Sequence, residues 1–157
     1  MTSGELPQPQ TRPLFVMRLA VDALVSIGGP DDIQRRIGNI PGGSFEGERL
    51  RGTVLSGGTD WQIVRGDGAV ELDGRIVLQT DDGALIAMTY TGLRHGAADV
   101  MAKLGRGEVV DPADYYFRIV PRLTTSEPRY AWLNRIIAVG IGHRLPEGPT
   151  YFVHQIL

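Results

Sequence analysis

The sequence contains no cysteine among its 157 residues, so disulfide bonds, thiol chemistry and sulfur-ligated zinc are excluded. It has no apolar run near the ~20 residues that a membrane helix needs, and no long run of like charge that would form a binding tail. The formal net charge of −2 gives no overall attraction to nucleic acid or to an anionic membrane. Residues 1–13 lack the basic and apolar regions of a signal peptide. We therefore expect a soluble, cytoplasmic protein.

Several motifs of common enzyme classes are also missing. There is no GxGxxG at the start of a helix, no GxxxxGK[ST] phosphate loop and no GxSxG nucleophile elbow. No nucleotide or flavin cofactor is therefore expected, and without cysteine covalent catalysis is not expected either. The three histidines (His95, His143 and His154) do not have the spacing of metal ligands, so no metal site is expected.

Glycine, by contrast, is abundant, with 21 residues, about twice the usual share of roughly 7%. The glycines are spread between apolar runs, as in the turns, bulges and bends of a curved sheet. The segments Gly66-Asp67-Gly68 and Asp81-Asp82-Gly83 predict two tight turns, because glycine readily supplies the positive φ that such turns need.

Alternation of apolar and polar residues predicts that most of the chain is antiparallel sheet. The predicted strands cover residues 14–27, 44–55, 61–65, 69–80, 84–91, 115–122, 129–133, 135–143 and 150–157. One short helix is predicted over 97–104, ending at Gly105, and the alternative for this segment is a loop. Eight or more such strands predict an all-β barrel or a strongly curved sandwich. We expect a single domain over residues 14–157 after a flexible lead-in of residues 1–13.

A barrel of about eight strands can hold one small ligand among its interior side chains, and the segment SGGTDWQ (56–62) supplies the first candidate residues. Asp60 at a cavity mouth would act as a general base, because an apolar surrounding raises the pKa of a carboxyl group. Trp61 would stack on the ligand. The alternative is a turn in which Asp60 caps a backbone amide and Trp61 closes the barrel end.

Polar residues on two predicted strands are further candidates. Alternation places Glu71, Asp73 and Arg75 on one face of strand 69–80, which is either a solvated outer face or the wall of a cavity. In the second case Asp73 and Arg75 contact the ligand, and Arg75 clamps a carboxylate or polarises a carbonyl. Arg118 on strand 115–122 has the same two interpretations, since a shift of one residue exchanges the faces.

Three more side chains are candidates for ligand contact. Glu46 lies among the glycines of GGSFEGERLRG, where the alternative is a bend in the strand. His95 lies at a strand end, where the alternative is a loop histidine. Trp132 would line the cavity or be a packed indole.

Five segments carry a resemblance to a known family. They are GGSFEGERLRGTVLSGGTDWQ (42–62), LDGRIVLQTDDGALIAMTYTGLR (72–94), YYFRIVPRLTT (115–125), YAWLNRIIAVGIGHR (130–144) and the closing TYFVHQIL (150–157). In these segments and their order, the chain resembles domain-of-unknown-function family 3237, also called uncharacterised protein family 0311. The resemblance implies a calycin-like antiparallel barrel and carries no established activity.

Barrels of this general kind sometimes serve as cofactor-free cyclases, isomerases or lyases, which is an analogy of fold only. The leading hypothesis is a cofactor-independent enzyme that acts on an apolar carbonyl- or carboxylate-bearing metabolite. Asp60 would transfer the proton and Arg75 would stabilise the developing negative charge. The alternatives are a non-catalytic small-molecule binding or carrier protein, and a purely structural or assembly role. A homodimer is compatible with the sequence, because two-fold oligomers are the commonest.

Overall fold

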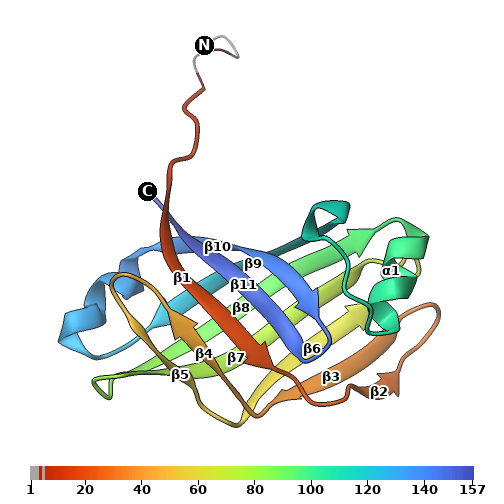
Figure 1. The fold of residues 1–157 in the computed structure, drawn as a ribbon, viewed down its shortest axis with the longest axis horizontal. Helices are drawn as coiled ribbons and strands as arrows, with labels where there is room; N and C mark the ends of the chain where they lie inside the picture. The colour runs from red at the N-terminus through yellow and green to blue at the C-terminus, as the bar shows by residue number, and fades with distance from the viewer. Residues whose placement is uncertain (1–3, 5) are drawn as a thin grey trace.

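The computed structural model describes residue 4 and residues 6–157. Its strands form an antiparallel sheet that closes into a barrel, as the sequence predicts (Figure 1). The eight strands of the closed barrel are β1 (Thr11–Ala20), β4 (Gly42–Glu46), β5 (Arg51–Val54), β7 (Val70–Thr80), β8 (Leu85–Gly96), β9 (Tyr115–Thr124), β10 (Ile137–Leu145) and β11 (Gly148–Ile156). Around the ring the order is β7-β5-β4-β1-β11-β10-β9-β8, and β8 pairs back to β7.

Three further strands extend the sheet from one edge of β7. They are β2 (Val25–Gly28), β3 (Gln34–Ile40) and β6 (Gly58–Val64). The long strand β7 pairs with β5 near its C-terminal end, where Leu78 lies opposite Val54, and with β6 along its N-terminal half. Strand β6 then pairs with β3, and β3 with β2. The wall of the barrel is therefore built by different strands at its two ends.

The predicted single strand over residues 14–27 is wrong, because β1 ends at Ala20. The backbone N–H of Val21 then bonds Glu147, and that of Asp22 bonds Asn39, at 3.0 and 2.9 Å. These bonds turn the chain out of β1 and into the separate strand β2. Strand β3 was not predicted.

Two other predicted strands also differ from the structure. The range 44–55 is a hairpin of β4 and β5, closed by a bond from Gly47 N–H to the Leu50 carbonyl at 2.9 Å. The range 129–133 belongs to the 3-10 helix η3 (Pro128–Arg135), which begins with a proline. The two predicted turns are confirmed, with φ of +87° at Gly68 and +89° at Gly83.

Helical segments lie at the ends of the barrel. The predicted helix is confirmed as α1 (Ala98–Gly105), and the 3-10 helix η2 (Pro112–Asp114) follows it. Segment η3 covers the opposite end, where Leu133 is fully buried and Tyr130 Oη donates to Asp82 Oδ2 at 2.8 Å. Figure 1 shows α1 and η3 at opposite ends of the strands.

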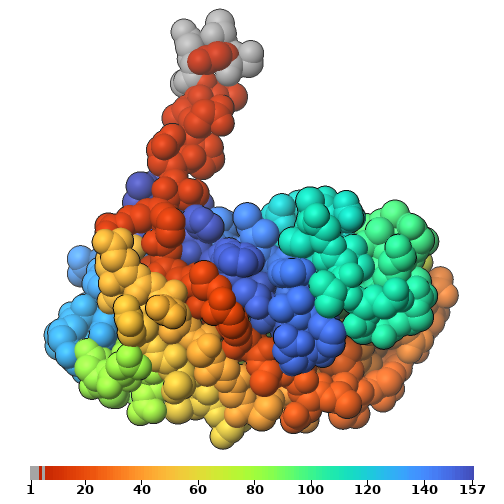
Figure 2. Space-filling model, viewed as in Figure 1, coloured from red at the N-terminus to blue at the C-terminus, as the bar shows by residue number. Residues whose placement is uncertain are grey.

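The start of β1 and the end of β11 lie side by side, since Thr11 pairs with Ile156 (Figure 1). The lead-in expected over residues 1–13 is shorter in the structure, because residues 11–13 already belong to β1. Residues 6–10 are exposed and project as an arm (Figure 2). Residues 1–3 and 5 lie outside the described part of the chain. In the described part of the chain, no helix has both the length and the apolar character needed to span a membrane.

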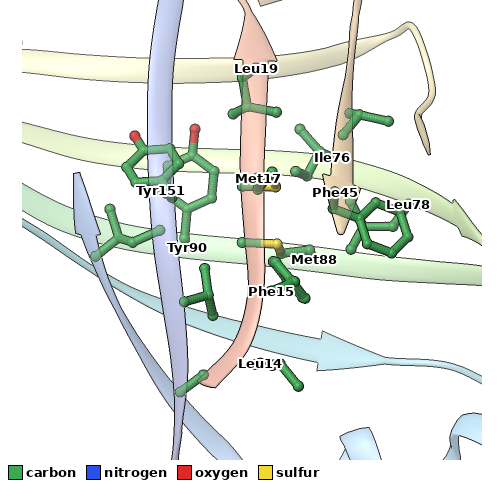
Figure 3. Packing of buried hydrophobic residues seen from close by; sticks show 14 of the residues in the cluster. Leu14, Phe15, Met17, Leu19, Phe45, Ile76, Leu78, Met88, Tyr90 and Tyr151 are labelled. Carbon is green, nitrogen blue, oxygen red and sulfur yellow. The ribbon is translucent and has the colours of Figure 1, made fainter. Parts of the chain in front are cut away.

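The interior of the barrel changes from apolar to polar along its axis. Met17, Leu78 and Met88 have no exposed surface and pack in the apolar part. Beside them Tyr90 and Tyr151 lie next to each other, with ring centroids 5.6 Å apart. Figure 3 shows the two hydroxyl groups pointing to the same side, away from Met88 and Leu14. The polar part of the interior begins at these hydroxyl groups.

Candidate functional site

The carboxylate of Asp60 lies inside the barrel, where it is 3% exposed. Alternation along β6 turns Gly58, Asp60 and Gln62 inward, and all three are buried. In the sheet, Asp60 pairs with Gly38 on one side and with Gly74 on the other. Both glycines allow close packing here, because a side chain at position 74 would overlap the Tyr90 ring and one at position 38 would overlap Val21. These three inward-facing residues of β6 form one side of the candidate site.

Two hydrogen bonds fix the orientation of the Asp60 carboxylate. Arg36 Nε donates to Gln62 Oε1 at 2.7 Å, and Gln62 Nε2 donates to Asp60 Oδ2 at 3.0 Å. The second oxygen, Oδ1, has no hydrogen-bond partner among the described residues. Burial raises the pKa of Asp60, and the Gln62 bond and the charges of Arg94, Arg144 and Arg36 offset this rise only in part. Asp60 therefore keeps one unpartnered buried oxygen, on a carboxyl group that takes up a proton more readily than an exposed one.

Arg94 enters the same interior from β8. It follows Ile86, Met88 and Tyr90 on the inward face of that strand and is 5% exposed. Its guanidinium carbon lies 5.1 Å from the centre of the Phe117 ring, and its Nε has no hydrogen-bond partner in the described part of the chain. Burial, then the charges of Arg144 and Arg36, lower the pKa of Arg94 to about 10.

Two tyrosines complete the polar interior. The hydroxyl oxygens of Tyr90 and Tyr151 are buried and make no hydrogen bond within the described residues. Burial raises the pKa of both, and the charge of Asp60 adds to the rise. Both hydroxyls therefore stay protonated at neutral pH and are available as neutral donors. On the two strands between them, β9 and β10, Tyr115 Oη accepts the backbone N–H of Arg144 at 2.8 Å.

A cavity of about 230 Å³ lies at the α1 end of this polar interior. Its lining consists of Leu24, Arg36, Val64, Gly68, Val70, Arg94, Met101, Leu104, Gly105 and Arg144. Three arginines thus face one small space whose described lining contains no carboxylate. Asp60 lies near enough that its charge acts on both Arg36 and Arg94. The three guanidinium groups can bind an anion, and Asp60 is linked to one of them, Arg36, through Gln62.

A second hollow, of about 720 Å³, lies on the outer face of β6 to β9. It brings together three sequence-predicted residues, Trp61, Asp73 and Arg118, and adds Tyr116. Trp61 is 47% exposed, so it neither enters the cavity nor closes the barrel end. Although this hollow is larger than the interior cavity, it is an open groove whose acidic residues Glu71 and Asp73 are exposed to water. The interior cavity, whose lining includes the buried Arg94, is the stronger candidate.

The structure does not bring Arg75 to Asp60. Strand β7 alternates strictly, so Asp73 and Arg75 are exposed on the outer face while Gly74 faces inward beside Asp60. The sheet itself therefore separates Arg75 from the interior. Within the site, Arg36, Arg94 and Arg144 hold the position that we expected for Arg75.

The other three predicted residues lie outside the interior site. Glu46 is exposed on β4. His95 is exposed on the outer face of β8, stacked on Tyr116 with ring centroids 4.9 Å apart. Trp132 lies in η3 at the other end of the barrel, beneath the guanidinium of Arg49, which is 4.2 Å from the ring centre.

Sequence reasoning missed Arg36, Gln62, Arg94 and Arg144. A signal was present for two of them: Arg94 continues the apolar face of its strand, and Arg144 continues the small-residue face of Ala138, Gly140 and Gly142. A charged residue that prolongs an inward face predicts a buried charge. Among residues 4 and 6–157, no cluster of three or more His, Asp or Glu side chains is placed to hold a metal ion.

Comparison with known proteins agrees with this architecture. The model of the family described as "Protein of unknown function (DUF3237)" matches residues 9–156. The chain belongs to the DUF3237 family. A curated member from Rhodopseudomonas palustris, a UPF0311 protein, is 37% identical over 151 residues, which are 96% of this chain and 99% of that one.

Solved structures extend the DUF3237 comparison. The crystal structure of the Rhodopseudomonas palustris protein has a TM-score of 0.94 at 37% identity and covers 97% of this chain and 100% of its own. A β-barrel-like protein from Acinetobacter baumannii has a TM-score of 0.84 at 41% identity, with 98% and 99% covered. A protein from Penicillium herquei, described as an enzyme, has a TM-score of 0.74 at 25% identity and covers 98% of this chain and 99% of its own.

Proposed function

We propose that this barrel is a cofactor-independent enzyme that binds a small carbonyl- or carboxylate-bearing metabolite in the interior cavity and moves a proton on it through Asp60. One observation carries the proposal: a carboxylate that is 3% exposed has an unpartnered oxygen and is linked through Gln62 to Arg36, in the lining of a cavity with three arginines. The similarity to the Penicillium herquei protein described as an enzyme supports catalysis over a purely structural role.

Proton abstraction next to a carbonyl is the step that fits these groups. Asp60 Oδ1 takes the proton from the carbon beside the carbonyl. The electron pair of the broken C–H bond forms a C=C bond, and the carbonyl π pair moves onto its oxygen. Arg94 stabilises the resulting enolate oxygen by charge, in surroundings where charge interactions are stronger than in water. Asp60 ends this step protonated.

Return of the proton completes the reaction. If Asp60 gives it to a different carbon, the product is an isomer. If the carbanion instead expels a leaving group, the proton passes to that group and the reaction is an elimination. Attack of the enolate carbon on a second carbonyl carbon in the same molecule closes a ring, the π pair of that carbonyl moves onto its oxygen, and Asp60 gives the proton to this oxygen. Each route regenerates the Asp60 carboxylate without a cofactor.

The neighbours of Asp60 support this role. Gln62, held by Arg36, donates to Oδ2 and leaves Oδ1 without a partner. The raised pKa of Asp60 brings the carboxyl group closer to the operating pH, which favours transfer of a proton in both directions. Tyr90 and Tyr151 offer neutral donors to an oxygen atom.

The test is hydrogen–deuterium exchange at the carbon next to a carbonyl, followed by NMR in deuterated buffer on a panel of small ketones and keto acids. We expect the wild type to exchange members of the panel faster than buffer, and Asp60→Asn to lose about 10²- to 10⁴-fold of that rate. Asp73→Asn is the matched control, because it removes the same charge from the outer face of the adjacent strand.

Two results would overturn the proposal: no exchange above the buffer rate, or the same exchange rate in Asp60→Asn as in the wild type. Binding of panel members without any exchange would instead identify a carrier, because the arginine-lined cavity binds an anion whether or not chemistry follows.

A further inference from the structure

We infer that the ligand is a small organic acid, and that its carboxylate is bound at the α1 end of the cavity by Arg94 and Arg144, with Arg36 beside them. This rests on the proposed function only in placing the ligand in the interior cavity. It goes further by choosing the acid over the neutral carbonyl compound, and Arg94 then has two roles: it binds the carboxylate, and its charge also acts on the enolate oxygen of the same molecule.

The charges around the cavity do not balance. Arg36, Arg94 and Arg144 line it, and its described lining contains no acid. Asp60 is the carboxylate whose charge acts on Arg94 and Arg36, while Arg144 acts on both of them as a like charge. Three guanidinium groups thus share one carboxylate, and a bound anion would supply the missing negative charge.

Arg94 is the group that most needs such a partner. It is 5% exposed, so water does not compensate its charge, and its Nε has no acceptor among the described residues. An arginine cannot escape this penalty by losing its proton at neutral pH. Arg36 already donates to Gln62, whereas Arg94 faces the cavity with its Nε free.

The form of the cavity selects a carboxylate with a short apolar body. Guanidinium groups bind carboxylates through two parallel hydrogen bonds. Between the arginines the wall is apolar: Leu24, Val64, Val70, Met101 and Leu104. A volume of about 230 Å³ corresponds to about eight water molecules at roughly 30 Å³ each. An organic acid of modest size satisfies both the charge and the apolar wall, whereas a hydrated inorganic ion satisfies the charge alone.

The test compares acids with their neutral amides. Calorimetric titration of the wild type with benzoate, benzamide, hexanoate and hexanamide should show at least one acid binding about tenfold or more tightly than its amide. Arg94→Met should lower the affinity for that acid by about ten- to a hundredfold, the value of a charge-assisted hydrogen bond. The affinities for the amides should not change. Arg122→Met, an exposed arginine on β9, is the control and should bind as the wild type does.

Folding and function are checked separately. Arg94→Met should melt at the same or a higher temperature than the wild type without ligand, since it removes an uncompensated buried charge. Arg94→Lys, which keeps the charge and loses the planar fork, should bind the acid with intermediate affinity. Asp60→Asn should keep the preference for the acid, because its neutral side chain no longer repels the anion.

The inference is overturned if each amide binds as tightly as its acid, if none of the four compounds binds, or if Arg94→Met binds the acid as the wild type does. Proton exchange that depends on Asp60, together with equal binding of acids and amides, would leave the proposed function standing and overturn this inference alone. Tighter binding of the acid than of its amide, without proton exchange, would leave this inference standing and overturn the proposed function alone.

Discussion

Gly74 and Tyr90 lie directly opposite each other on β7 and β8, and the Tyr90 ring occupies the space in which a side chain at position 74 would lie. On its other edge Gly74 pairs with Asp60. The missing Cβ therefore lets the ring pack across β7 and places Tyr90 near enough to Asp60 that the carboxylate charge raises the Tyr90 pKa. The apolar core and the polar site meet at this glycine.

Gly74→Ala should destabilise the protein by about 1–3 kcal/mol, because the added methyl group overlaps the Tyr90 ring in a packed core. Urea unfolding measures the change. Gly42→Ala on β4 is the control, since its methyl group would meet only an ordinary contact, 3.6 Å from the Val54 carbonyl oxygen. Equal stabilities of the two variants would mean that Tyr90 is not held against Gly74.

Gln62→Leu should destabilise the protein by about 1–3 kcal/mol, because it leaves Arg36 Nε and Asp60 Oδ2 without the partner they share. Gln34→Leu, an exposed position on the same sheet extension, should change the free energy of unfolding far less. Chemical denaturation of both variants measures this. If Gln62→Leu has the same free energy of unfolding as the wild type, the bridge from Arg36 to Asp60 contributes nothing to stability.

Asp60→Asn should stabilise the folded protein at neutral pH. Burial raises the folded-state pKa of Asp60 above its ordinary 3.8, so the folded state binds this proton more tightly than the unfolded state does. As pH rises from 3.8 through the raised pKa, the wild type loses stability, and the loss persists above that pKa.

The stability gap between Asp60→Asn and the wild type should therefore be largest at neutral pH and should close as pH falls below 3.8. Unfolding curves recorded across this range measure it. Asp73→Asn makes the same change in net charge on the exposed face of β7 and separates the effect of burial from that of charge. A gap that widens toward acid would contradict a raised pKa.

Arg75→Gln should leave the rate of proton exchange unchanged, whereas Arg94→Gln should lower it by about 10²-fold or more, the loss typical of one stabilising donor. The reason is position: Arg75 is exposed on the outer face of β7, and Arg94 lines the cavity. The same NMR assay measures both variants. A loss in Arg75→Gln would move the chemistry to the outer face.

The barrel itself was predictable because alternation is strong where one face is buried. Strand β7 shows this most clearly, with Leu72, Ile76 and Leu78 buried between exposed Glu71, Asp73 and Arg75. The break after Ala20 was not predictable, because it depends on backbone bonds from Val21 to Glu147 and from Asp22 to Asn39, which lie far apart in sequence.

The site was only partly predictable. Asp60 was a candidate because it follows two glycines and precedes a tryptophan, and the structure places it in the interior. Its expected partner Arg75 lies on the other side of the sheet, since alternation alone does not say which face is inside. Arg36 lies in a strand that was not predicted, and Arg94 was overlooked beside His95, although it continues the inward face of β8.

The position of a bound ligand tests the interior site most directly. The chain has four methionines and two tryptophans, of which Met101 lines the interior cavity and Trp61 lines the outer groove. NMR of methionine methyl groups and tryptophan indole N–H groups, during titration with an acid that binds in the calorimetric test, reports on both places at once. We predict that the Met101 signal shifts with saturation and that the Trp61 signal stays in place. A saturating shift of Trp61 with an unmoved Met101 would contradict the interior site.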